Sequence, residues 1–231
     1  MSICLIKQPA GIGDIFYLQK FASIIRDSGY TVIWPLKDKL MWIKNYIPDI
    51  EFVSIDSQFP GKELYTSGEF AIELDNFLFL SPDGYQILGH RIMGSKYELI
   101  GHDDSDWVEY FKFNRNVEKE DDLYYNVLGL NDNSEYVYVN SYYNTDNYTT
   151  NIFADKEFKY PVIENKIINE YSLFDWCKVW ENAKQIHTTP TSLCYILETL
   201  DTKSELFYYC RDQLQYVEHT PLFKKSINWI Q

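Results

Sequence analysis

The fold is decided by a stretch near the N-terminus, Ile3-Cys4-Leu5-Ile6-Lys7-Gln8-Pro9-Ala10-Gly11-Ile12-Gly13-Asp14. It begins with an apolar run typical of a buried strand, and its two glycines indicate a turn. Apolar residues at helical spacing follow from Ile15 to Ile25, and Gly29 stands where a C-terminal cap is expected. A second apolar run, Thr31–Trp34, completes a strand–helix–strand unit. The pattern predicts an α/β domain with an acidic residue in the first turn of its first helix.

The rest of the chain repeats this alternation, which predicts an α/β protein with parallel sheets. We expect two small Rossmann-like domains, residues 1–113 and 114–231, with a charged helix over Arg115–Leu128 as the connection between them. The further strands are predicted at Glu51–Ile55, Phe70–Leu74, Glu135–Ser141, Gln185–His187 and Glu205–Cys210. The further helices are predicted at Lys37–Tyr46, Pro82–Met93, Ser172–Asn182 and Pro190–Leu200, whereas Gly94–Asp106 is polar and without a period.

Composition narrows the class of partner. The 231 residues carry a formal net charge of −13 and no cluster of Lys and Arg, which argues against nucleic acid and favours a small molecule. The four cysteines form no CxxC pair, and three of them lie in apolar runs, so we expect reduced core residues. We find neither a secretory leader nor an apolar window long enough for a membrane span, and we therefore expect a cytoplasmic protein.

Gly11-Ile12-Gly13-Asp14 matches neither standard nucleotide motif, because it lacks the third glycine of the dinucleotide fingerprint and the Lys-Ser/Thr of the P-loop. Gly11 and Gly13 allow the backbone to approach a ligand closely. Asp14 lies near a helix N-terminus, where the helix dipole favours an ionised carboxylate that can accept a proton. The alternative is that Asp14 only caps the helix.

A second group of polar residues, His187-Thr188-Thr189-Pro190-Thr191-Ser192, lies at a predicted strand end and helix start. Backbone N–H groups and hydroxyls converge at such a helix start, which indicates either a diphosphate site or an ordinary N-cap. Asn140, Ser141 and the loop from Tyr142 to Thr150 follow the first strand of the second half, and ligands of α/β sheets bind beyond such strand ends, which predicts contact with the donor. His187 is a candidate for contact with phosphate or a leaving group, with a structural role as the alternative.

A metal site is not expected. Asp104-Ser105-Asp106 has the DxD form that binds Mn²⁺ or Mg²⁺ in one large class of glycosyltransferases, but it lies in a polar stretch and not at the end of a hydrophobic strand. We therefore interpret it as a solvated loop. The four histidines are too dispersed to indicate a zinc site.

The block from Gly11 to Pro35 resembles the opening of GT-B-type glycosyltransferases, especially the bacterial lipopolysaccharide heptosyltransferase family, whose first strand ends in a Gly-Asp pair at the head of a long helix. In that family the aspartate is thought to be the general base, which implies this role for Asp14. The block from Tyr171 to Ser192 looks like the donor-half pattern of such enzymes. The donor-binding residues implied by this resemblance are Gly11, Gly13, Asn140, Ser141, His187, Thr188, Thr189, Thr191 and Ser192.

The resemblance implies a GT-B-like fold whose two domains face a central cleft, with residues 1–113 on the acceptor side and 114–231 binding the nucleotide sugar. The implied activity is transfer of a sugar from a nucleotide-diphosphate donor to a glycan hydroxyl, inverting and without a metal or other cofactor. The family's Asp-Ser-Gly phosphate turn is replaced here by His187 to Ser192, so heptose is not implied. The alternatives are a nucleotide-sugar epimerase or hydrolase, and a non-catalytic nucleotide- or glycan-binding protein.

Overall fold

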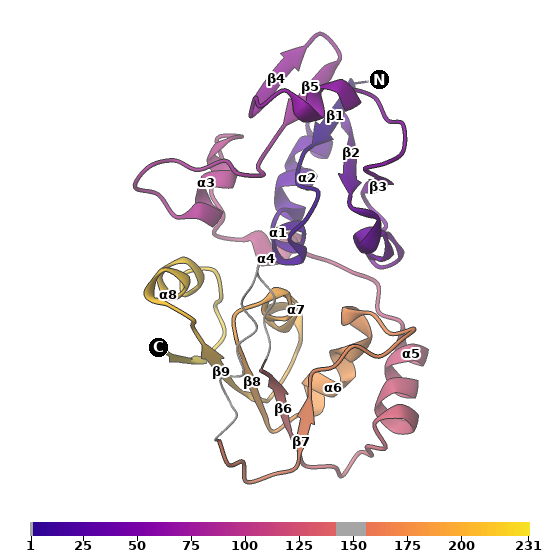
Figure 1. Ribbon diagram of the computed structural model, residues 1–231, viewed down its shortest axis with the longest axis vertical. Coiled ribbons are helices and arrows are strands. Elements are labelled where there is room, and N and C mark those ends of the chain that lie inside the picture. The colour runs from indigo at the N-terminus through magenta and orange to yellow at the C-terminus, as the bar shows by residue number, and fades with distance from the viewer. Residues whose placement is uncertain (1, 142–155) are drawn as a thin grey trace. The chain divides into compact units, whose positions relative to one another are not determined.

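The computed structural model describes residues 2–141 and 156–231, which fold as two compact units, Met1–Asn114 and Arg115–Gln231 (Figure 1). We refer to them as unit 1 and unit 2 and describe each by itself. Each unit contains one five-stranded sheet with helices between the strands. None of the helices in the described residues has the length and apolar character needed to cross a membrane.

The sheet of unit 1 has the strand order β3-β2-β1-β5-β4. Its strands are β1 (Ser2–Ile6), β2 (Tyr30–Leu36), β3 (Glu51–Ser54), β4 (Ala71–Leu74) and β5 (Phe77–Leu80). The β1 strand pairs in parallel with β2 and with β5, and β2 pairs in parallel with β3. Leu5 and Phe79, from the central β1 and β5, are fully buried in the core of this sheet.

This sheet is mixed, whereas the sequence predicted only parallel pairing. β4 and β5 run antiparallel because Asp75 and Asn76 alone join them, and a two-residue turn can connect only antiparallel strands. The sequence analysis found β4 but missed β5. The missed strand is the one that pairs with β1 at the centre of the sheet.

The helices of unit 1 are α1 (Ile12–Tyr17), α2 (Gln19–Asp27), η1 (Asp38–Asn45), η2 (Lys62–Thr66), α3 (Ile92–Glu98) and α4 (Trp107–Tyr110). The predicted helix over Pro82–Met93 is wrong. Gly84 and Gly89 adopt φ of +74° and +85°, so this segment forms turns and a loop up to Arg91, where a helix starts instead. Part of the stretch predicted to be irregular is therefore α3.

The sheet of unit 2 is entirely parallel, with the order β10-β9-β8-β6-β7. Its strands are β6 (Val137–Asn140), β7 (Val162–Glu164), β8 (Gln185–Thr188), β9 (Glu205–Tyr209) and β10 (Ile227–Ile230). Its helices are α5 (Val117–Asp121), η3 (Asp122–Val127), η4 (Leu173–Trp176), α6 (Cys177–Asn182), α7 (Ser192–Thr199) and α8 (Gln213–His219). The sequence predicted β6, β8 and β9 and missed β7, β10 and α8.

The charged helix predicted as a connection is the first part of unit 2, where ion pairs fix it. The guanidinium of Arg115 binds the carboxylate of Glu120 and also lies 2.6 Å from Glu181 Oε1 on α6. The side chain of Glu120 is only 2% exposed. Both glutamates raise the pKa of Arg115, so the guanidinium stays charged at any pH at which the protein folds.

Arg115→Met should destabilise the fold, because it leaves the buried Glu120 carboxylate without its cation. We expect a loss of about 2 kcal/mol in the free energy of unfolding, measured by urea denaturation, after allowing for the partial exposure of Arg115. Arg26→Met is the matched control, because Arg26 pairs with Asp27 at an exposed surface. Equal losses in the two variants would contradict the importance assigned to the Arg115 pairs.

Candidate active site

The candidate site of unit 1 lies at the carboxyl ends of β1 and β5. From β1 the chain passes through α1 and α2 to β2 on one side, whereas β5 lies on the other side of β1 and continues to α3. Such a switch point opens a crevice beyond the strand ends, where ligands of α/β sheets bind. The turn between β1 and α1 carries Gly11, Gly13 and Asp14 to this point.

Neighbouring backbone and side chains hold this turn in place. Trp34 Nε1 donates to Gln8 O at 2.9 Å, and Lys37 N donates to Pro9 O at 3.0 Å. Gly11 follows with a φ of +81°, which disfavours any residue with a side chain. A Cβ at Gly11 would also overlap Asp14 Oδ2. The position of the Asp14 carboxylate therefore depends on glycine at residue 11.

Asp14 forms an ion pair that the sequence did not predict. Its Oδ1 lies 2.7 Å from Lys96 Nζ on α3, and the same ammonium donates to Gln8 Oε1 at 2.9 Å. The Lys96 side chain is 6% exposed and that of Asp14 is 29% exposed. The carboxylate is therefore tied to a buried cation on one side and still accessible to solvent.

The capping alternative for Asp14 does not describe this geometry. The N-cap of α1 is Gly11, and no side chain caps the helix. Asp14 is the third residue of α1, after Ile12 and Gly13, and its carboxylate is directed to Lys96. Lys96 itself was missed because its segment was predicted to be irregular. The sequence does indicate a helix here, because Met93, Lys96 and Tyr97 have the spacing of residues on one helix face.

The Asp104-Ser105-Asp106 segment is packed against α1 and α2 by its two carboxylates. Asp104 Oδ2 accepts hydrogen bonds of 2.6 Å from Tyr17 Oη and from Arg91 Nη2, and Asp106 pairs with Lys20. Both carboxylates therefore have cationic or phenolic partners within unit 1. In residues 2–141 and 156–231, no group of three or more His, Cys, Asp or Glu side chains is arranged to hold a metal ion.

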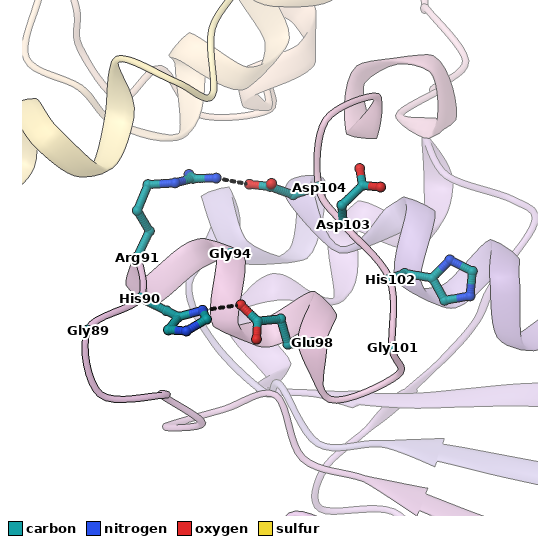
Figure 2. A pocket seen from close by; sticks show the side chains of 9 residues that line it. All are labelled: Gly89, His90, Arg91, Gly94, Glu98, Gly101, His102, Asp103 and Asp104. Atoms are coloured by element: carbon teal, nitrogen blue, oxygen red, sulfur yellow. Dashed lines mark hydrogen bonds and ion pairs between the residues drawn. The ribbon is translucent and has the colours of Figure 1, made fainter.

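A polar pocket of about 710 Å³ lies beside α3, but it is not part of the Asp14 site (Figure 2). Four of its ionisable side chains form two pairs, with Arg91 bound to Asp104 and His90 Nδ1 2.5 Å from Glu98 Oε1. Gly94 and Glu98 line this pocket. Both lie on the face of α3 opposite to Lys96, because a helix turns by about 100° per residue.

The candidate site of unit 2 also lies at a switch point, between β6 and β8. Asn140 ends β6, and its Nδ2 donates to Thr188 Oγ1 at the end of β8, at 2.9 Å, and to Thr191 Oγ1 at 3.3 Å. Asn165, which follows β7 and was not predicted as a site residue, donates to Asn140 Oδ1 at 2.9 Å. One hydrogen-bond network thus joins the carboxyl ends of three neighbouring strands.

Hydroxyl groups surround the start of α7, as the sequence predicted. Thr191 is the N-cap and Ser192 the first helical residue, and no side chain caps the helix. Thr189 is 1% exposed, and its Oγ1 has no hydrogen-bond partner within the described part of the chain. Ser141 is buried directly after β6. The expected donor loop, residues 142–150, lies outside the described residues.

His187 is placed differently from these residues. It is 2% exposed, its ring stacks on Phe207 at 4.3 Å, and its Nδ1 lies 2.9 Å from Tyr209 Oη. Burial and the nearby charge of Lys156 lower the pKa of His187 to about 4. The imidazole is therefore neutral near pH 7 and enclosed by aromatic rings. This geometry favours the structural role and not the predicted contact with phosphate.

No protein-family model and no curated protein sequence matches the chain. Several solved structures, in contrast, match its fold. A family 9 glycosyl transferase from Veillonella parvula DSM 2008 superimposes with a TM-score of 0.59 at 8% identity, over 99% of this chain and 86% of that one. The iron-containing dodecameric glycosyltransferase TibC from enterotoxigenic E. coli H10407 gives a TM-score of 0.50 at 9% identity, over 90% of this chain and 58% of TibC.

A second TibC structure, described as a heptosyltransferase in complex with ADP-D-beta-D-heptose, gives a TM-score of 0.49 at 10% identity, over 91% of this chain and 60% of that one. The chain thus spans less than two thirds of TibC. The resemblance to GT-B-type glycosyltransferases is confirmed at the level of the fold.

Gly11→Ala should cost more stability than an ordinary glycine replacement. A left-handed φ alone costs about 1 kcal/mol for alanine, and the overlap with Asp14 adds to this. Gly68→Ala is the control, because Gly68 has a φ of +80° with open space around it. Urea denaturation should show the larger loss for Gly11→Ala, and equal losses would contradict the close approach to Asp14.

His187→Phe should weaken the dependence of stability on pH. Unfolded His187 takes up a proton below its ordinary pKa of 6.5, whereas the folded protein resists protonation down to about pH 4. The wild type therefore loses stability as the pH falls through this window, by about 2 kcal/mol between pH 7 and pH 4.5 from this group. His187→Phe should lack this part of the loss in thermal denaturation, whereas His90→Gln, at a half-exposed histidine, should keep it. Parallel pH profiles for wild type and His187→Phe would refute the assignment.

Proposed function

We propose that this protein is a glycosyltransferase that moves a sugar from a nucleotide-diphosphate donor to a glycan hydroxyl. One combined observation carries the proposal. A carboxylate lies at the switch point of one sheet, and a helix start lined by hydroxyls lies at the switch point of the other. The chain also has the fold of a family 9 glycosyl transferase. Ligands of α/β sheets bind at such points. Unit 1 supplies the base and unit 2 the donor site.

In the proposed reaction Asp14 is the general base. Its accessible carboxylate takes the proton of the acceptor hydroxyl while the hydroxyl oxygen forms a bond to the anomeric carbon. The bond from the anomeric carbon to the donor phosphate oxygen breaks, and its electron pair leaves with the nucleoside diphosphate. This direct displacement inverts the anomeric configuration.

The donor diphosphate binds at the start of α7 in this proposal. The first-turn N–H groups of α7 are not capped by a side chain, and the hydroxyls of Thr189, Thr191 and Ser192 lie beside them. Such groups stabilise the negative charge that develops on a departing diphosphate. Asn140 and Thr188 fix the two strand ends that carry these groups. In unit 1, Gly11 and Gly13 allow a ligand to approach the backbone closely beside Asp14.

We further propose that transfer needs no metal ion. Support comes from the DxD-like segment, whose carboxylates bind Lys20, Arg91 and Tyr17, and from the helix start, which can take over charge stabilisation. TibC is described as iron-containing, so the comparison leaves this part open to test. Turnover that persists after treatment with EDTA supports metal independence, and loss of turnover restored by a divalent cation contradicts it.

Two rival functions are separated by product analysis. A nucleotide-sugar epimerase or hydrolase converts the donor without an acceptor, because the same scaffold can hold a sugar nucleotide alone. A non-catalytic binding protein binds nucleotide or glycan without turnover. Formation of a glycoside only when an acceptor is present favours transfer over both.

Asp14→Asn should abolish most transfer while the fold and donor binding remain. The amide oxygen can still accept the hydrogen bond of Lys96, but it cannot take a proton, so we expect a loss of about 10²–10⁴-fold in kcat. Transfer is measured as glycoside formed from a panel of nucleotide sugars. Donor binding is measured as the rise in melting temperature with UDP, GDP, ADP, TDP or CMP, because a ligand of the folded state raises its stability.

Asp27→Asn is the control for this experiment, because Asp27 lies at an exposed end of α2 and pairs only with Arg26 among the described residues. It should transfer like the wild type. Unchanged turnover in Asp14→Asn would remove Asp14 as the base. If no nucleotide raises the melting temperature of the wild type, the donor assignment of unit 2 fails.

A further inference from the structure

Lys96 is buried in a way that lysine rarely tolerates without a compensating partner. Its side chain is 6% exposed, and its ammonium lies 2.7 Å from Asp14 Oδ1 and 2.9 Å from Gln8 Oε1. Both acceptors come from the segment that follows β1, whereas Lys96 comes from α3 after β5. The ammonium thus joins the two connections that leave the central strand pair.

We propose that Lys96 is a positioning residue for the general base: its ammonium binds Oδ1 of Asp14 and fixes the carboxylate, so that Oδ2 receives the proton of the acceptor hydroxyl. This inference rests on the proposed function. It is supported by Gly11, whose missing Cβ leaves the space that Oδ2 occupies. Lys96 and Gly11 together determine which oxygen of the carboxylate is available.

The position of Lys96 is itself fixed by its helix. Tyr97 Oη donates to Tyr17 O at 2.5 Å, and the two rings pack edge to face with centroids 5.0 Å apart. Ser95 Oγ donates to Arg91 O at 2.9 Å at the start of α3. The contacts of Tyr97 anchor α3 to Tyr17 of α1, so the ammonium is held beside Asp14 before a substrate binds.

Other charged and titratable groups around this pair have partners of their own. Tyr17 and Arg91 bind Asp104, and Lys20 binds Asp106. Four further groups lie on the elements packed against the pair. The ammonium of Lys7 lies over the ring of Tyr65, and Asp83 follows β5. Tyr97 donates to Tyr17 O, and Asp103 accepts from Ser105. Within the described residues, Lys96 is the cation in ion-pair contact with Asp14.

The test is the separation of kcat from KM in Lys96→Gln. Glutamine keeps a hydrogen-bond donor, but its side chain is shorter and lacks the ammonium that holds Oδ1. We expect kcat at pH 7 to fall about tenfold, while KM for the donor changes less than about twofold.

Two further variants separate positioning from stability. Lys96→Arg keeps the charge and a hydrogen-bond donor in a different geometry, so it should recover part of the kcat that Lys96→Gln loses. Lys20→Met is the matched control, because the Lys20 side chain is also 6% exposed and ion-paired in unit 1 but does not pair with Asp14. It should lose stability and keep the kcat of the wild type. An unchanged kcat in folded Lys96→Gln overturns the proposal.

A measurement without turnover distinguishes failure of this inference from failure of the proposed function. Crystal structures of the wild type, Lys96→Gln and Lys20→Met show the orientation of the Asp14 carboxylate. Oδ1 should face residue 96 in the wild type and in Lys20→Met, and the carboxylate should lose this orientation in Lys96→Gln. If no glycoside forms in any assay but this change is seen, the proposed function fails and the pairing stands. If the carboxylate has the same orientation in all three proteins, Lys96 does not position Asp14.

Discussion

The pairing of β5 with β1 is the constraint on which unit 1 depends. It places two chain connections on opposite sides of the central strand pair, so residues 82 positions apart along the chain, Asp14 and Lys96, meet at the same strand ends. The buried Lys96 ammonium then requires a partner, because an unpaired buried charge is costly, and the partly exposed Asp14 carboxylate is that partner. The geometry of the candidate base is thus a consequence of sheet topology and of one ion pair with a buried cation.

Unit 2 uses the same topological principle with different chemistry. Its switch point separates β6 and β8, and neutral side chains occupy it: Asn140 binds Thr188 and Thr191, and Asn165 binds Asn140. Backbone N–H groups and hydroxyls can bind a phosphate although they carry no permanent charge, because the helix start supplies partial positive charge. The charged pair of unit 1 fits a general base, and the neutral network of unit 2 fits a leaving-group site. These are the two roles that we propose.

Much of the fold was predictable because it follows from local pattern. The turn from Gly11 to Asp14, the strands β1, β2, β6 and β8, and the helix after Pro190 each have apolar periodicity bounded by a turn or cap. β5 was missed because the Asp75-Asn76 turn divides a short apolar run into two strands. That omission, and the wrong helix over residues 82–93, concealed Lys96, whose partner is set by strand order and not by its neighbours in sequence. The surroundings of His187 could not be predicted, because only the fold brings Phe207 and Tyr209 against its ring.

The central claim is that the chain transfers a sugar from a nucleotide-diphosphate donor to an acceptor hydroxyl. The most direct test is mass spectrometry of the wild-type protein incubated with nucleotide sugars and glycan acceptors, with NMR of the anomeric proton of any product. We predict one added sugar of inverted configuration, together with an equal amount of released nucleoside diphosphate, only when acceptor is present. Donor hydrolysis or epimerisation without an acceptor, or donor binding with no product across the panel, would contradict the account.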